Sequence, residues 1–250
     1  MSSAAATSSK LAALLAKDVR GILRDRLLVF LVGYGLLIAA VLRGVIPFVP
    51  VDDLFLLVAP AAPFIGTLLV GTVLGFALVD EREAGTWLLL RVLPLSEGSL
   101  GAYLLGVTTA TALVSGAACA AIYGQPVERP LLHAAALLTT ALSAPAMAFF
   151  LGGLASNKIE AMALGKLSNL PVSAPLLAFV LPAPWHLALA WSPFYWLYLA
   201  LLRSSAPDAV LDDLPLAWPA VPDAMLVIIP ALILLAASAV FARRFRRVAS

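Results

Sequence analysis

The sequence predicts an all-α integral membrane protein with an N-terminal amphipathic elbow helix, six transmembrane helices, and a re-entrant helical hairpin between the fifth and sixth. Of its 250 residues, 62% are hydrophobic and only 12% are charged, whereas charged residues make up about a quarter of a soluble domain. The mean hydropathy is +1.02. Long apolar runs recur along the chain, and each approaches the roughly 20 residues that cross a bilayer as a helix.

The first expected element is an amphipathic helix over residues 10–26. The apolar residues that recur there at helical spacing are Leu11, Leu15, Val19 and Ile22. Basic residues, Arg20 and Arg24 among them, occupy the other side, so the helix is expected to lie in the headgroup layer. A simple juxtamembrane anchor is the alternative. No secretory signal is expected, because residues 2–9 are small and polar and no cleavage site follows a short apolar run.

Six apolar runs are expected to cross the membrane, over residues 27–46, 54–79, 100–123, 131–155, 164–181 and 224–242. With a cytoplasmic N-terminus, all of the 16 Lys and Arg residues except Arg43, Arg129 and Arg203 fall on the inner side. This distribution follows the positive-inside rule. We therefore expect a single transmembrane domain over residues 1–250, in a bacterial plasma membrane, with both termini cytoplasmic.

The segment over residues 182–223 contains an apolar stretch, 185–202, that could span by its length alone. A crossing there would place the arginines of residues 243–247 outside, against the charge bias. Ser192-Pro193 also interrupts the run, because proline lacks a backbone donor. We expect two short helices that enter the outer leaflet and return, packed on the bundle rather than facing lipid.

Motifs of catalysis are not found in this sequence. Glu160 stands where a phosphate-binding loop ending at Gly165-Lys166 would need its first glycine. His133 and His186 have no carboxylate at ligand spacing and are interpreted as interfacial amphipathic residues. The net charge of +2 is too small to favour nucleic-acid binding. We expect no metal and no cofactor in the chain, and the lack of mid-span ionisable groups favours an apolar or amphipathic cargo over ion-coupled transport.

The loop over residues 80–99 is expected to face the cytoplasm and carries the most information. It begins with Asp80-Glu81-Arg82-Glu83-Ala84-Gly85-Thr86-Trp87, where the glycine permits a sharp change of direction. A short amphipathic helix is expected next, until Pro94 ends it. Its Trp and Leu side chains form an apolar surface in a loop facing water, which favours contact with lipid or a protein partner. A turn that only reconnects two spans is the alternative.

This loop resembles a known family signature. Glu81-Arg82-Glu83-Ala84-Gly85-Thr86, followed by Pro94-Leu95-Ser96, is similar to the Glu-x-Glu-x-Gly-Thr...Pro-Leu-Ser motif of type-2 ABC exporter permeases. Arg24-Asp25-Arg26 resembles the end of their elbow helix. Asn157-Lys158-Ile159-Glu160 and Pro193-Phe194-Tyr195-Trp196 are similar to the drug-export branch labelled fluoroquinolone-export permeases.

The resemblance implies a permease subunit that exports a small molecule. Its implied partners are a second permease chain, in a homodimer or heterodimer, and a separate ABC ATPase subunit that binds ATP and Mg²⁺. The residues implied in coupling to that ATPase are Glu81, Arg82, Glu83, Gly85, Thr86, Trp87, Arg20 and Arg24. Trp87 replaces the small aliphatic residue that is usual in the motif. Arg20 or Arg24 could pair with Glu81 or Glu83.

Small and polar residues within the spans indicate close helix packing or a transport pathway. The candidates are Gly71, Gly75, Thr108, Thr109, Thr139 and Thr140, of which the two glycines form a Gly-x-x-x-Gly pair. Three other functions stay open on the sequence: a haem-export permease of cytochrome maturation, a membrane-embedded enzyme, and a non-transporting anchor or assembly protein.

Overall fold

The computed structural model describes residues 26–50, 54–85, 97–178, 181, 188–207 and 221–248. Within those ranges every regular element is a helix, as the sequence predicted. The helices are α2 (Arg26–Val45), η1 (Ile46–Phe48), α3 (Leu54–Val58), α4 (Ala61–Glu83), α6 (Glu97–Tyr123), α7 (Pro130–Ala141), α8 (Ser143–Leu154), α9 (Lys158–Leu167), α10 (Asn169–Ala178), α11 (Pro193–Ser205) and α13 (Asp223–Val248). The predicted elbow lies outside the described residues, apart from Arg26.

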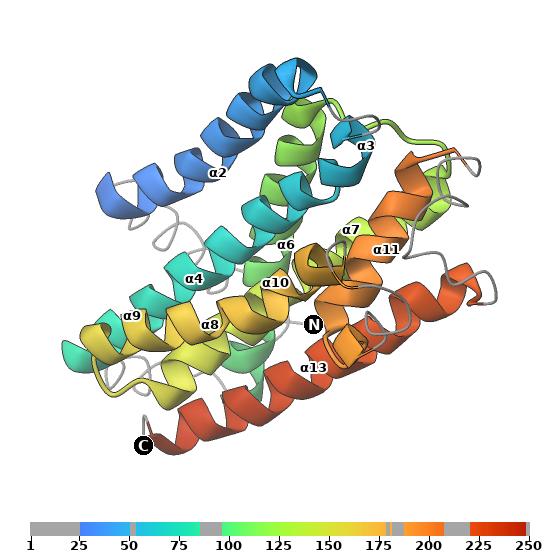
Figure 1. The fold of residues 1–250 in the computed structure, drawn as a ribbon. Helices are drawn as coiled ribbons and strands as arrows, with labels where there is room; N and C mark the ends of the chain where they lie inside the picture. The colour runs from blue at the N-terminus through green and yellow to red at the C-terminus, as the bar shows by residue number, and fades with distance from the viewer. Residues whose placement is uncertain are drawn as a thin grey trace, which may run out of the picture.

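Four helical segments of the described residues are long and apolar enough to cross a membrane: Leu54–Glu83, Gly101–Tyr123, Pro130–Leu154 and Asp223–Arg247. A fifth apolar helix, Gly33–Phe48, is shorter. Figure 1 shows α13 along one edge of the bundle and α2 along the opposite edge, with α4 and α8 between them. Four of the six predicted spans thus coincide with candidate spans, the first coincides with the shorter helix, and the fifth differs.

The predicted fifth span over residues 164–181 is not one continuous helix. Helix α9 ends at Leu167, where the backbone N–H of Ser168 donates to Leu164 O at 2.9 Å. The Ser168 hydroxyl donates to Gly165 O at 2.6 Å, so the last turn of α9 is closed locally. Pro171 follows in α10 and cannot donate to the carbonyl four residues earlier. The predicted fifth span is therefore formed by two helices, α9 and α10, that meet at Ser168.

A second proline explains how α11 is attached to α10. Pro175 lies inside α10 and offers no N–H to the carbonyl of Pro171. That carbonyl accepts instead from the Ser192 hydroxyl at 2.6 Å. Ser192 is also the N-cap of α11, because its side-chain oxygen accepts from the N–H of Phe194 at 3.3 Å. One buried serine thus binds the carbonyl that Pro175 leaves free inside α10 and also begins α11.

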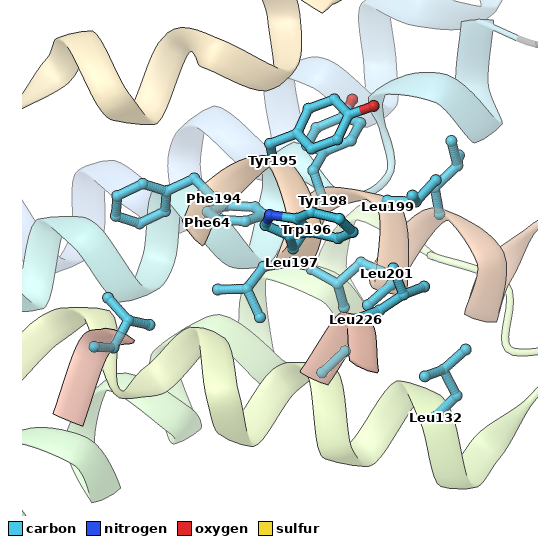
Figure 2. Packing of buried hydrophobic residues seen from close by; sticks show 14 of the residues in the cluster. Phe64, Leu132, Phe194, Tyr195, Trp196, Leu197, Tyr198, Leu199, Leu201 and Leu226 are labelled. Atoms are coloured by element: carbon cyan, nitrogen blue, oxygen red, sulfur yellow. The ribbon is translucent and has the colours of Figure 1, made fainter. Parts of the chain in front are cut away.

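Helix α11 lies inside the bundle rather than on its surface. Every residue from Phe194 to Leu202 is buried. Figure 2 shows Phe64 of α4 beside the α11 side chains, and the same buried cluster includes Leu132 of α7 and Leu226 of α13. The Trp196 indole N–H donates to Ala190 O at 2.7 Å, and the Tyr198 hydroxyl donates to Leu57 O. The sequence prediction that this segment packs on the bundle is confirmed for α11.

Glycines set the closest helix crossings. A Cβ on Gly71 would lie 2.7 Å from both Cα and O of Ala144, so α4 and α8 touch there through their backbones. A Cβ on Gly75 would lie 2.8 Å from the Leu151 side chain, one turn further along the same crossing. On the other side of α4, the Ser115 hydroxyl of α6 donates to Gly66 O at 3.1 Å. The Gly-x-x-x-Gly pair is therefore a contact between α4 and α8 within one chain.

Candidate functional site

Polar contacts gather at the two ends of the bundle. Helix α13 joins these ends, and its 26 residues extend about 39 Å, more than the roughly 30 Å of a bilayer's hydrocarbon core. The Arg82 cluster, at the C-terminal end of α13, comprises Asp80, Arg82, Gly152, Gly153, Ala155, Lys158 and Arg244. The Asp223 network, at the other end, comprises Arg129, Arg203, Ser204, Val221 and Asp223.

Arg82 fastens the end of α4 to the end of α8. Its Nη1 donates to Gly152 O at 2.8 Å, and its Nη2 donates to Ala155 O. The last carbonyls of a helix have no partner within the helix and carry partial negative charge. A guanidinium presents several N–H groups in one plane and can satisfy two of them together. The Arg82 side chain therefore caps α8 from a neighbouring helix.

Helix α13 reaches the same end of α8. Arg244 Nε donates to Gly153 O at 3.2 Å. A Cβ on Gly153 would lie 2.9 Å from Phe241 O and 3.2 Å from Phe245 N, so the α8 and α13 backbones meet directly. Phe245 is 1% exposed and also lies against Gly152. Glycine is required here because any side chain would separate the two helices.

Helix α9 joins the cluster through a surface ion pair and is capped at its start. Lys158 Nζ lies 2.8 Å from Asp80 Oδ2, with 47% and 43% of the two side chains exposed. Asn157 is the N-cap, and its side-chain oxygen accepts from the N–H of Glu160 at 2.9 Å. The Glu160 carboxylate accepts from the backbone N–H of Ser156 at 2.6 Å and from its hydroxyl. These Ser156 hydrogen bonds lower the pKa of Glu160.

Beyond Arg82 the chain turns outward. Glu83, Ala84 and Gly85 are exposed, while Glu81 is half-buried. Gly85 has φ +69, a left-handed conformation that glycine adopts without strain. A Cβ there would meet nothing within 4 Å, so the conformation rather than crowding calls for glycine. The sharp turn that the sequence predicts at Gly85 is confirmed.

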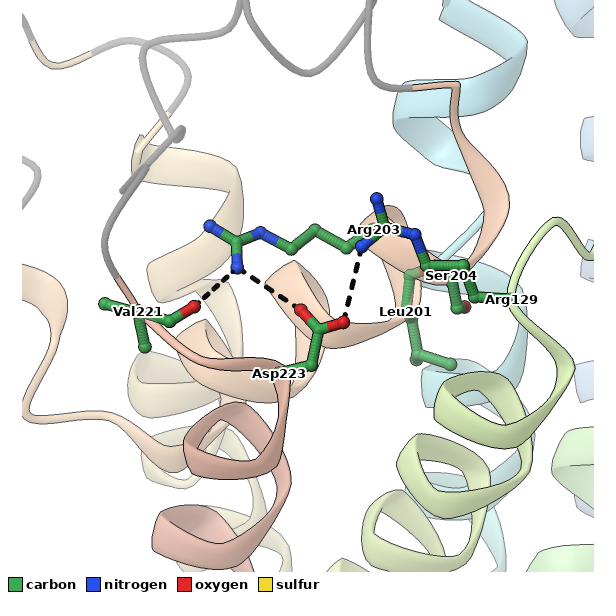
Figure 3. A network of polar contacts seen from close by, with 6 residues as sticks. All are labelled: Arg129, Leu201, Arg203, Ser204, Val221 and Asp223. Atoms are coloured by element: carbon green, nitrogen blue, oxygen red, sulfur yellow. Dashed lines mark hydrogen bonds and ion pairs between the residues drawn. The ribbon is translucent and has the colours of Figure 1, made fainter.

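The Asp223 network holds three helices together at the opposite end (Figure 3). The Asp223 carboxylate lies 3.3 Å from Arg129 Nη1 and 3.4 Å from Arg203 Nη1. Arg203 also donates to Val221 O at 2.8 Å, and its side chain is only 12% exposed. The backbone N–H groups of Glu128 and Arg129 both donate to Ser204 O. The start of α7, the end of α11 and the start of α13 are therefore tied at one point.

One family profile matches residues 18–237, and the family is described as fluoroquinolones export permease protein Rv2686c-like. The match covers well over half of the 250 residues. The chain belongs to this family of export permeases. No curated protein and no solved structure matched the chain.

Membership of the export permease family confirms the resemblance found in the sequence. It identifies the chain as a membrane permease and indicates a transport subunit rather than an enzyme. Most of the Arg82 cluster and all of the Asp223 network lie within the matched range, whereas Arg244 lies beyond it. Among the residues that the structure describes, no three His, Cys, Asp or Glu side chains come together as a metal site would require.

The structure places the predicted coupling residues of the permease only in part. Arg82 points into the bundle at α8, whereas Glu83 and Gly85 are exposed beside it. Four of the predicted residues lie outside the described ranges, namely Arg20, Arg24, Thr86 and Trp87. The expected pairing of the elbow arginines with Glu81 or Glu83 therefore stays a prediction.

Three of the four predicted pathway threonines bond within their own helices. The Thr109 hydroxyl donates to Leu105 O at 2.7 Å, Thr139 donates to Ala135 O at 2.9 Å, and Thr140 donates to Ala136 O at 2.8 Å. Such bonds to the carbonyl four residues earlier satisfy a hydroxyl in an apolar environment. Thr108 and Thr140 are buried. The role of these threonines in a transport pathway stays a prediction.

Two polar contacts of the permease were not foreseen from its sequence. His133 is 8% exposed, and its Nδ1 lies 2.9 Å from Ser204 Oγ, so its side chain is bound within the protein. Arg43 Nη1 donates to Tyr123 O at 3.2 Å, and its guanidinium lies 5.1 Å from the centre of the Phe55 ring. Both contacts join residues more than 65 positions apart, so no local pattern could reveal them.

Proposed function

We propose that the chain is the transmembrane subunit of an ATP-driven ABC exporter. Two permease chains and a separate ATPase subunit would move an apolar or amphipathic small molecule, such as a fluoroquinolone, out of the cytoplasm. The observation that carries the proposal is the match to the export permease family over residues 18–237. The end of α4 supports it, because Glu83 and Gly85 of the exporter-like motif are exposed where a partner could bind.

The Arg82 cluster is proposed to lie at the cytoplasmic surface. Asp80, Lys158 and Arg244, all assigned to the inner side by the charge bias, belong to this one cluster. Arg129, Arg203 and Asp223, assigned to the outer side, meet in the Asp223 network at the other end. The grouping of these two sets at opposite ends supports a topology with both termini cytoplasmic in a bacterial plasma membrane.

The segment that contains α11 is proposed to be re-entrant from the outer side. Ser192, at the start of α11, contacts Pro171 within α10, and Arg203, at its end, reaches Asp223. Helix α11 therefore runs between the interior of the bundle and its outer end, a length of about 20 Å for its 13 residues. Its buried side chains suit a short helix held by protein rather than by lipid.

Cysteine accessibility tests this topology. Cys119 is the only cysteine, so Cys119→Ala provides a background for single cysteines at the exposed residues Glu128 and Arg246. A membrane-impermeant maleimide added to intact cells should label position 128 and not position 246. In everted vesicles the pattern should reverse. Labelling of position 246 from outside would overturn the proposed topology.

Transport is tested by producing the permease together with a candidate ABC ATPase, which would be sought among the reading frames that neighbour the permease gene. Everted vesicles containing both subunits should accumulate a fluorescent fluoroquinolone when ATP is added. Vesicles with an ATPase variant that cannot hydrolyse ATP should not. Haem supplied in the same assay tests the cytochrome-maturation alternative, and accumulation of haem alone would favour it. Failure of the two subunits to copurify would contradict the proposed partnership.

A further inference from the structure

We propose that Arg82 is a positioning residue that transmits movement of the exposed residues 83–85 to α8 and α13. The inference rests on the proposed function, because it assumes that an ATPase subunit acts on this end of α4. The sequence motif suggests a docking role for all the charged residues of this segment. The structure separates Arg82 from its neighbours, because its guanidinium is bound to carbonyls of the permease itself.

The geometry makes this connection stiff. Arg82 is the penultimate residue of α4, directly before Glu83, so any displacement of the exposed turn reaches it directly. Its two donor nitrogens bind the carbonyls of Gly152 and Ala155, on either side of the last residue of α8. Two hydrogen bonds from one rigid plane fix orientation as well as distance. The end of α8 must therefore follow α4 in rotation and in translation.

From α8 the displacement passes to α13 without intervening side chains. The backbone of Gly153 faces Phe241 O and Phe245 N across the gap that a Cβ would fill. Arg244 donates to Gly153 O from α13, so the same turn of α8 is held from both neighbouring helices. A packed interior has few intermediate arrangements and transmits strain. Helices α4, α8 and α13 are expected to move as one unit at this end.

The ion pair of Asp80 with Lys158 offers a matched control. Asp80, like Arg82, lies near the C-terminal end of α4. Nearly half of each side chain in the Asp80–Lys158 pair is exposed, however. Exposed pairs of this kind contribute only about 0 to 1 kcal/mol. The Lys158→Gln substitution removes a charged contact of the same helix end and leaves the Arg82 hydrogen bonds in place. A general sensitivity of this surface to charge would affect both variants equally.

The experiment follows the two ends of the proposed connection separately. In the Cys119→Ala background, one protein carries spin labels at positions 84 and 128, and another carries them at positions 246 and 128. Position 128, normally Glu128, is the reference in both. Proteins labelled only at position 84, normally Ala84, or only at position 246, normally Arg246, are also prepared. Distances to position 128 are measured in the complex with the ATPase, without nucleotide and after trapping with ATP and vanadate. In the otherwise unsubstituted protein and in Lys158→Gln, the distances from both position 84 and position 246 should change on trapping.

In Arg82→Gln, position 84 should still respond to nucleotide while position 246 does not. Drug transported per ATP hydrolysed should fall by about fivefold or more, with hydrolysis itself retained. Arg82→Lys keeps the charge but can hold only one carbonyl well, so its response at position 246 and its coupling of transport to hydrolysis should be intermediate. It also provides a second variant if the Arg82→Gln protein does not reach the membrane in usable amounts. If Arg82 were purely structural, its substitution would lower thermal stability, but the labels at positions 84 and 246 would still respond to nucleotide in the same way.

Two results are decisive in different ways. An unchanged response at position 246 in Arg82→Gln or Arg82→Lys would overturn the role of Arg82 and leave the proposed function standing. No response at position 84 in the otherwise unsubstituted complex, or no complex at all, would contradict the proposed function itself. The failure of each idea is therefore visible separately.

Discussion

The crossing of α4 and α8 at Gly71 gives a quantitative test of the packing. The Cβ of Gly71→Ala would lie 2.7 Å from Cα and O of Ala144 and 3.0 Å from Cβ of Met147. Carbon atoms in contact normally lie about 3.5 to 4.0 Å apart. Because the two nearest atoms belong to the α8 backbone, relief requires the helices to separate, and overpacking of this kind typically costs about 1 to 3 kcal/mol.

Gly106→Ala is the matched control. A Cβ on Gly106, which also lies within a helix, would meet nothing within 4 Å. Replacing a helical glycine by alanine favours the helix by up to about 1 kcal/mol. That gain is common to both variants and cancels in their difference. The difference in unfolding free energy between Gly71→Ala and Gly106→Ala should therefore be about 1 to 3 kcal/mol.

The assay is reversible unfolding in mixed detergent micelles, in which the mole fraction of dodecyl sulfate is raised and helix content is followed by circular dichroism. Gly75→Ala should fall between the other two variants, since its nearest neighbour at 2.8 Å is the Cδ1 of Leu151, which can rotate away. Equal stability of Gly71→Ala and Gly106→Ala would refute the proposed close crossing. A larger loss in Gly75→Ala than in Gly71→Ala would contradict the distinction between backbone and side-chain contact.

Three further predictions use the same unfolding assay or hydrogen exchange. Asp223→Asn leaves Arg203, whose side chain is only 12% exposed, without its carboxylate partner, and should lower the free energy of unfolding by about 1 to 3 kcal/mol. Asp80→Asn, in an exposed pair, should lower it by at most about 1 kcal/mol. Equal losses of stability in the two variants would contradict the argument from burial. Ser192→Ala removes the donor to Pro171 O and should cost about 1 to 3 kcal/mol, while Ser173→Ala, whose hydroxyl bonds only within its own helix, should be nearly neutral. The lowered pKa of Glu160 means that its stabilisation of the start of α9 is complete above the ordinary glutamate pKa and lost as the pH falls through the lowered value. The protection of the Ser156 amide, which is its exchange rate compared with that of an unstructured peptide at the same pH, should then fall in acid, and Glu160→Gln should remove that pH dependence.

The helix positions were largely predictable because apolar run length is a local property. The predicted spans 54–79 and 131–155 correspond to Leu54–Glu83 and Pro130–Leu154 among the candidate membrane helices. The break at Ser168 was not predicted. Whether a proline only bends a helix or ends it depends on which group satisfies the released carbonyl. For the carbonyl of Pro171, which Pro175 releases inside the continuous helix α10, that group is Ser192, 21 residues away.

The sequence indicated which segment forms the candidate site, but it did not indicate which groups its side chains contact. The motif drew attention to residues 80–85, and the turn at Gly85 followed from glycine alone. The partners of Arg82 could not be foreseen, since they are backbone carbonyls 70 and 73 residues away and any sequence offers such groups. A charged residue in an exposed-looking motif can bind inward whenever a helix end lies within its reach.

The division within this short segment changes how its charges should be interpreted. Asp80 binds Lys158 of α9, Arg82 binds the end of α8, and only Glu83 is left fully on the surface before the turn. A docking surface must be exposed, whereas a connection that carries movement must be bound inside the protein. A single segment can therefore serve both purposes only if successive residues point in different directions, and the helical end of α4 provides that arrangement. Substitutions at Glu83 and at Arg82 should accordingly impair different steps, partner binding in the first case and transmission in the second.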